Sequence, residues 1–202
     1  MFADRTSAPA RSDDVLTPPA AGEALPRVLA STVRTGPLLV HGRLHHPRAR
    51  RCVVLGFADG STSRVYRETQ VGDGRAAEPA TLVVGFVLRG VRGRWPHTAF
   101  RVESWLNTPL FVGFPGFTSK LWMTADEHGL YRGLYEWDGA DRAASYARSL
   151  SWVLALVCVP GTVRARVVPG LHRDDVLARP EVLGVPRHEE DRWWRPVAHR
   201  RT

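Results

Sequence analysis

The order of strand-like and helix-like segments between residues 80 and 170 constrains the fold more than any other feature of the sequence. Residues 81–89 (TLVVGFVLR) form an almost continuous apolar run, which predicts a buried strand. Residues 117–124 and 130–137 alternate in polarity, and the ADEHG sequence between them predicts a hairpin connection. Residues 162–168 predict a last strand, which a Pro-Gly pair ends.

Two helices are expected between these strands. Residues 97–114 carry apolar side chains at roughly helical spacing, and Pro109 should end the regular part of that helix near Asn107. The second helix follows Asp138, a plausible N-cap, presents one apolar face and stops at Pro160. The order strand, helix, strand, strand, helix, strand predicts an α+β fold, a ferredoxin-like β-α-β-β-α-β domain.

The residues before this domain predict short antiparallel strands. Residues 38–44, 52–58 and 62–67 are apolar or β-branched, and an Asp-Gly pair between the last two is a strong hairpin signal. A small antiparallel β meander is therefore expected ahead of the domain. The whole chain then divides into a flexible N-terminal arm, the meander, the ferredoxin-like domain and a basic C-terminal tail, at residues 1–35, 36–70, 80–170 and 171–202.

The charge balance bears on the partner. The formal net charge is +8, which is typical of nucleic-acid-binding proteins. However, Lys120 is the only lysine, and the arginines are scattered and often alternate with apolar residues, as on a solvated strand face. Nucleic acid is therefore not the expected partner. Trp193 and Trp194, beside arginines in the tail, are expected to cover an edge of the same protein rather than a partner or a membrane.

The location of the protein and its metal content are judged from sequence signals for membrane spans, secretion and metal ligands. No apolar run approaches the ~20 residues that span a bilayer, and the acidic start MFADRTSAPARSDDVL is not a secretory signal. The cytoplasm is the expected location. The two cysteines make neither a disulfide framework nor a metal site, and the histidines lack ligand spacing, so no metal is expected.

A family resemblance is carried by three features of residues 115–170. The strand with Lys120 and Trp122 in a K-x-W pattern precedes a Gly- and Tyr-containing strand, and an Ala-rich helix with Tyr146 follows an acidic turn. This segment resembles the second half of YdhR-like and antibiotic-biosynthesis-monooxygenase-type domains. The resemblance, over residues of about 80–170, implies the dimeric α/β-barrel type of domain, in which two sheets of a homodimer face each other.

The resemblance also implies an activity. Its members include oxygenases that oxidise aromatic rings without metal, flavin-assisted oxygenases and haem-degrading enzymes. The expected function is a monooxygenase-like tailoring enzyme for a hydrophobic aromatic or polyketide-like metabolite. No cofactor is predicted, although reduced flavin or haem is compatible with the family. The alternative is a non-catalytic protein on the same fold that binds a hydrophobic ligand or a partner enzyme.

The expected first helix supplies one set of candidate residues. His97, Arg101 and Trp105 follow at four-residue steps, and a Trp wall with an Arg or Asn donor would bind a planar substrate and stabilise an enolate. His97, Arg101 and Asn107 are the catalytic candidates of this segment, and Phe100 and Trp105 are substrate-binding candidates. The competing interpretation is that Arg101 is solvated and Trp105 belongs to the core.

The strands and the second helix supply the other set. A composition that favours arginine but keeps Lys120 indicates that a compact ammonium is needed, which makes Lys120 a catalytic candidate. It could instead form a cross-strand ion pair with Glu136, on a face shared with Trp122. Tyr131 and Tyr135 are expected on the opposite face, as pocket residues or as ordinary core aromatics. The substrate-binding candidates here are Trp122, Tyr131, Tyr135, Glu136 and Tyr146.

Overall fold

The computed structural model describes residues 14–90, 111–186 and 188–201. Within these ranges the chain forms an eight-stranded sheet in the order β7-β4-β6-β5-β3-β2-β8, with β1 beside β3, and all its pairs are antiparallel. The sheet curls into a half-barrel. The strands are β1 (Leu44–His45), β2 (Val53–Phe57), β3 (Thr62–Val71), β4 (Pro79–Val87), β5 (Phe117–Met123), β6 (Leu130–Asp138), β7 (Arg164–Pro169) and β8 (Pro196–Arg201).

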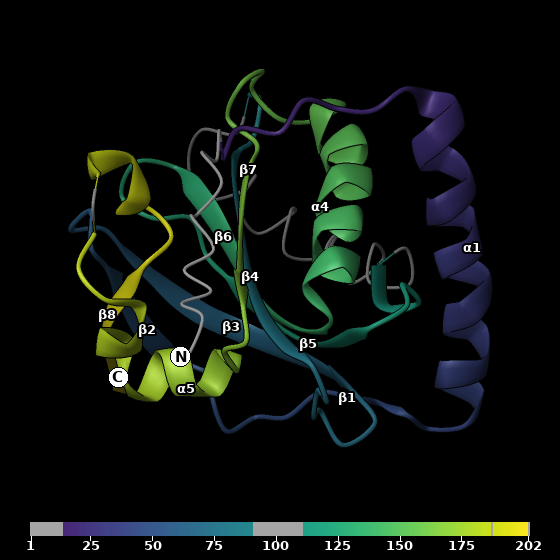
Figure 1. Ribbon diagram of the computed structural model, residues 1–202, viewed down its shortest axis with the longest axis horizontal. Helices are drawn as coiled ribbons and strands as arrows, with labels where there is room; N and C mark the ends of the chain where they lie inside the picture. The colour runs from purple at the N-terminus through teal and green to yellow at the C-terminus, as the bar shows by residue number, and fades with distance from the viewer. Residues whose placement is uncertain (1–13, 91–110, 187, 202) are drawn as a thin grey trace, which may run out of the picture.

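Helices cover both faces of this sheet. Helix α4 packs on one face, and α1 lies on the outer side of α4 (Figure 1). The opposite face is covered by α5 and by the segment that leads to β8 (Figure 1). The helices are α1 (Ala21–Val40), α4 (Ala140–Ala155) and α5 (Arg173–Ala178), with 3-10 turns η1 (Pro180–Leu183) and η2 (Glu189–Asp191).

The fold class expected from the sequence is wrong. The strands expected at 81–89, 117–124, 130–137 and 162–168 are present as β4, β5, β6 and β7. They do not, however, form a separate ferredoxin-like domain of the dimeric α/β-barrel type. Strand β3 pairs with β5 from Val65↔Met123 to Gln70↔Ser119, so the expected meander continues the same sheet. Local periodicity could not reveal this, because the pairing joins residues 49 to 58 positions apart.

The C-terminal segment is part of the same sheet and core. Strand β8 pairs with β2, with His199 opposite Leu55. Trp193 and Trp194 are buried against the face that carries α5. A Cβ at Gly85 would lie 2.7 Å from the Trp193 ring, so the missing side chain on β4 makes room for the indole. The tryptophan pair therefore packs on the chain itself.

Helix α1 replaces structure that was expected to be a strand. The sequence predicted a flexible arm over residues 1–35 and a strand at 38–44, but α1 runs from Ala21 to Val40 and contains two prolines. Its buried side is made of small residues, and Gly113 packs directly against it. A Cβ at Gly113 would lie 2.0 Å from the Ser31 carbonyl oxygen. Tertiary packing thus stabilises a helix that the prolines disfavour.

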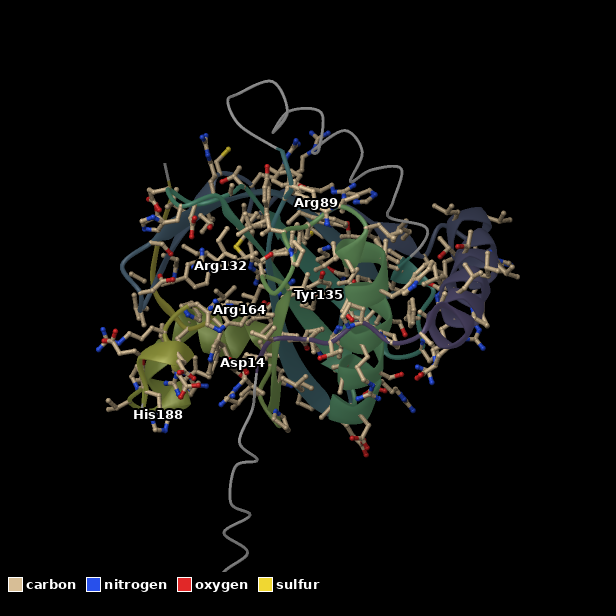
Figure 2. All side chains as sticks on the ribbon, turned by 90° about the horizontal axis from the view of Figure 1, so that it is seen from above. Asp14, Arg89, Arg132, Tyr135, Arg164 and His188 are labelled. Atoms are coloured by element: carbon tan, nitrogen blue, oxygen red, sulfur yellow. The ribbon has the colours of Figure 1, made fainter. Side chains whose placement is uncertain are left out.

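The alternation of β6 creates two different cores. Tyr135 and Trp137 point toward α4, whereas Arg132 and Leu134 point toward α5 and the C-terminal segment. Figure 2 shows Tyr135 beside α4 and Arg132 on the other side of the sheet. Each face of the sheet can therefore hold a site of its own.

Candidate functional site

The structure brings together four of the residues that the sequence proposed for a site. Lys120 and Trp122 on β5, Tyr135 on β6 and Tyr146 on α4 all lie on the α4 face of the sheet. Lys120 Nζ is 3.2 Å from the centroid of the Trp122 ring and 4.7 Å from that of Tyr135. The single lysine of the chain therefore sits between two aromatic rings.

Register and a glycine explain this placement. Lys120 is opposite Tyr135, and Trp122 is opposite Gly133. A Cβ at Gly133 would lie 2.8 Å from the Tyr135 ring, so only a residue without a side chain allows the phenol to lie along the strand here. The sequence analysis put the tyrosines on the face opposite Lys120, and that assignment is wrong. A register shift between Phe117 and Ser119 sets which side chains of β5 and β6 meet.

Strand β3 adds two residues that the sequence analysis missed. The Arg67 guanidinium carbon lies 4.1 Å from the Trp122 ring centroid, and Trp122 Nε1 donates a 2.9 Å hydrogen bond to Thr69 Oγ1. Both β3 residues are buried. Their only signal in the sequence was a charged residue within a strand-like run, and its meaning depends on the pairing of β3 with β5. We call Arg67, Thr69, Lys120, Trp122 and Tyr135 the Lys120 site.

The electrostatics of the site favour an uncharged lysine. Lys120 is 8% exposed. Its Nζ atom contacts the faces of two aromatic rings, and no carboxylate in the described part of the chain forms an ion pair with it. Burial, and after it the positive charge of Arg67, lowers the pKa of the Lys120 ammonium well below its ordinary value. A neutral amine at near-neutral pH can accept a proton or attack an electrophile.

The neighbouring tyrosines are neutral hydrogen-bonding groups. Tyr146 donates a 3.4 Å hydrogen bond to the Tyr135 hydroxyl. Burial raises the pKa of both phenols above the ordinary value, so neither acts as a base at neutral pH. The Tyr146 ring also contacts the rings of Phe114 and Trp137, with centroids 5.2 Å and 4.7 Å away. The α4 side of the site is therefore an aromatic wall.

Two other sequence candidates lie elsewhere. Glu136 is opposite Ser119 and points to the α5 face, so it forms no ion pair with Lys120. Its carboxylate shares a 2.7 Å hydrogen bond with His172 Nδ1 and accepts the Arg173 backbone N–H, which anchors the start of α5. Tyr131 stacks on Phe86 with centroids 5.7 Å apart. Burial raises its pKa to about 12.

Comparison with protein-family models, curated proteins and solved structures gave no match. The resemblance of residues 80–170 to YdhR-like and antibiotic-biosynthesis-monooxygenase-type domains therefore stays an expectation from the sequence. The remaining candidates of the expected first helix lie outside the described residues: His97, Phe100, Arg101, Trp105 and Asn107.

The described residues also bear on metals and membranes. Nowhere in 14–90, 111–186 and 188–201 do three or more His, Cys, Asp or Glu side chains gather in a way that could hold a metal ion. In the same ranges, no helix has the length and hydropathy of a membrane span.

Proposed function

We propose that the protein is a small-molecule enzyme that binds a hydroxylated aromatic molecule at the Lys120 site and uses the Lys120 amine as a base. The observation that carries this proposal is a buried lysine held against two aromatic rings without an acidic partner among the described residues. A structural lysine in a protein interior is ordinarily paired with a carboxylate. An amine kept neutral by its surroundings is suited to proton transfer.

The chemistry follows from the residues around the amine. Lys120 accepts the proton of the substrate hydroxyl, which leaves an ammonium beside a phenolate. The two opposite charges then stabilise each other where water is largely excluded. Arg67 contributes a second positive charge near the developing anion, since its guanidinium stacks on the same indole.

A monooxygenase reaction is the finer part of the proposal. A phenolate with an adjacent methylene carbon is electron-rich enough to react with O₂. One oxygen atom becomes the new carbonyl oxygen, and the other leaves as water with the two methylene hydrogens. The substrate supplies all the electrons, so this reaction needs no flavin or haem.

The oligomeric state and location are also proposals. Exposed apolar side chains on α1, among them Leu29, Val33 and Val40, are compatible with a homodimer. Only two cysteines in 202 residues are compatible with the cytoplasm, where disulfides are rare. Sedimentation velocity tests the dimer directly.

The test uses 2-naphthol and an anthrone as probes, because each absorbs differently as a phenol and as a phenolate. We expect the wild-type protein to bind 2-naphthol as the phenolate near neutral pH and to speed O₂ consumption by the anthrone. Lys120→Met should lose the phenolate band and at least ~100-fold of the rate, the usual share of a general base. Arg64→Met, an exposed position on β3, is the matched control.

The outcomes separate the two candidate functions. A phenolate band and O₂ consumption that survive in Lys120→Met would contradict the role of the amine. Binding of ionised naphthol without O₂ consumption would favour the alternative, a non-catalytic protein for a hydrophobic ligand.

A further inference from the structure

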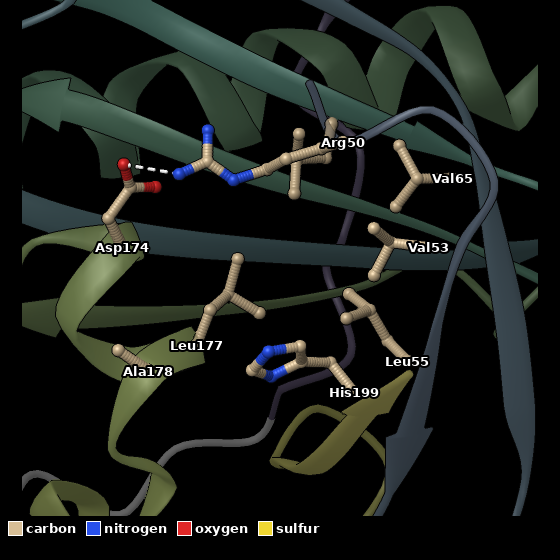
Figure 3. Close-up of a pocket in the computed structure, with 9 residues that line it drawn as sticks. Arg50, Val53, Leu55, Val65, Asp174, Leu177, Ala178 and His199 are labelled. Atoms are coloured by element: carbon tan, nitrogen blue, oxygen red, sulfur yellow. Dashed lines mark hydrogen bonds and ion pairs between the residues drawn. The ribbon is translucent and has the colours of Figure 1, made fainter. Parts of the chain in front are cut away.

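The face of the sheet opposite the Lys120 site contains a cavity of about 170 Å³. It lies between α5 and the strands β2, β3, β5 and β8, and we call it the α5-face cavity. Figure 3 shows aliphatic side chains of β2, β3 and α5 converging on it. Its lining residues are Arg50, Val53, Leu55, Val65, Leu121, Asp174, Leu177, Ala178 and His199.

The volume and the lining residues of the cavity limit the kind of molecule that it can bind. Six of its nine lining side chains are aliphatic, and none of the described residues that line it is Phe, Tyr or Trp. A dry cavity of ~150 Å³ with aliphatic and aromatic walls can accommodate one benzene-sized molecule. The α5-face cavity therefore has room for a saturated group of about six carbons.

Four charged side chains form a closed network of ion pairs at one end of the cavity. Arg50 contacts Glu68 Oε1 at 3.3 Å and Asp174 Oδ2 at 2.6 Å. Arg173 contacts the same Glu68 oxygen at 2.8 Å and Asp174 Oδ1 at 3.0 Å. Two positive and two negative groups thus alternate around a ring, and Glu68 and Arg173 are buried. Because both acids bind both arginines, Arg50 is held in place at the cavity wall.

Among the residues that line the cavity, the hydrogen-bonding capacity left at this end is that of the Arg50 donors; Glu68 Oε2 is a buried acceptor without a partner among the described residues, but Glu68 does not line the cavity. A guanidinium has five N–H groups, and the Arg50 contacts with described residues involve one bond from Nη1 and one from Nη2. Both oxygens of Asp174 already accept bonds from arginines. His199, on the other side of the cavity in Figure 3, adds an imidazole. A ligand in the cavity should therefore present an acceptor toward Arg50.

We propose that the α5-face cavity is a second small-molecule site, separate from the Lys120 site, which binds a short aliphatic carboxylate. The saturated chain lies among Val53, Leu55, Val65, Leu121 and Leu177, and the carboxylate accepts hydrogen bonds from Arg50. An aliphatic tail matches the aliphatic walls, and an anionic head matches the surplus of N–H donors. The aromatic Lys120 site takes a different class of molecule.

The experiment compares hexanoate, 1-hexanol and acetate with the full-length protein by isothermal titration calorimetry. We expect hexanoate to bind at least ten times more tightly than either of the others, since only hexanoate has both parts. Equal affinity for hexanoate and 1-hexanol would overturn the carboxylate assignment. No binding of hexanoate would overturn the site.

Two variants locate the binding. Ala178→Trp places an indole at an exposed position on the cavity rim and should abolish hexanoate binding. Ala77→Trp, in an exposed loop before β4, is the matched control and should bind hexanoate like the wild type. Arg50→Met should reduce hexanoate affinity to that of 1-hexanol, with thermal unfolding used to verify that it folds. Hexanoate affinity that is unchanged in Ala178→Trp would place the binding elsewhere.

Discussion

At the scale of single residues, Lys120 is the group whose surroundings decide its chemistry. A cation–π contact contributes roughly 0.5–2 kcal/mol, whereas the effective cost of removing an ammonium from water is several kcal/mol. The rings of Trp122 and Tyr135 therefore cannot offset the desolvation of the charged form, and Arg67 adds repulsion. The balance favours the neutral amine, although the same lysine in solvent would be charged.

This balance predicts that Lys120→Met stabilises the protein by roughly 1–3 kcal/mol near pH 6, because the variant removes an amine that must lose its proton and its hydration when it is buried without a carboxylate partner among the described residues. The pKa of Lys120 is lowered in the folded state, so between that value and 10.5 the unfolded chain binds more protons. Wild-type stability therefore rises with pH in this window. The advantage of the variant should shrink as the pH rises toward 10.5.

Urea unfolding at about pH 6, 8 and 10 measures this difference. Arg64→Met, which changes an exposed charge, serves as the control and should give a small difference that is nearly independent of pH. A Lys120→Met difference that does not change with pH would mean that Lys120 titrates normally in the folded protein.

At the scale of elements, β6 connects the two faces of the molecule. Its Tyr135 contributes to the Lys120 site, and its Glu136 anchors the start of α5 on the other face. Arg132 on the same strand is buried and binds Asp126 and Asp59 at 2.7 Å each, and the Trp193 carbonyl oxygen at 2.8 Å. This arginine ties the β2–β3 and β5–β6 turns to the C-terminal segment. Arg132, on the α5 face of β6, thus stabilises the fold by connecting these segments.

The contact between α1 and the rest of the protein yields a paired prediction. Gly113→Ala should destabilise the protein by roughly 1–3 kcal/mol, because its Cβ would meet the Ser31 carbonyl oxygen at 2.0 Å. Gly36→Ala, in open space within α1, should stabilise it by roughly 0.5–1 kcal/mol through helix propensity. Urea unfolding compares the two. Similar effects at both positions would contradict the close packing of α1 at Gly113.

At the scale of the whole molecule, one sheet joins segments that the sequence divided into several parts. Each face of this sheet carries its own hydrophobic core, and β6 contributes to both. Segments near both ends of the described chain also pair with the edges of the sheet. Residues near Asp14 pair with the edge of β7, where Ala165 N–H donates to the Asp14 carbonyl oxygen at 2.8 Å. β8 extends the sheet beyond β2 at the other end.

A continuous sheet predicts cooperative unfolding. Urea transitions followed by tryptophan fluorescence and by far-UV circular dichroism should coincide, because separating β3 from β5 would expose both cores at once. Trp193→Ala, which truncates a buried indole of the C-terminal segment, should lower both midpoints together, at a cost of roughly 3–5 kcal/mol. Two separated transitions would indicate that the meander and the domain fold independently.

The sequence by itself determined the local elements. The apolar run of β4, the alternation of β5 and β6 and the amphipathic face of α4 are properties of neighbouring residues, so periodicity located them. Lys120 could be singled out as a candidate because it is the only lysine. Such signals extend over a few residues and carry no information about distant partners.

Only the tertiary structure decided how these elements combine. The pairing of β3 with β5 brought Arg67 to Lys120, and the shifted register of β5 and β6 placed Tyr135 rather than Glu136 beside the amine. Residues 38–40 continue helix α1 instead of forming a strand, and Gly113 packs against Ser31 and Thr35 of the same helix. The physical reason is the same in each case. Strand register and helix docking minimise the free energy of contacts between residues far apart in the chain, and a one-residue shift changes which face a side chain occupies.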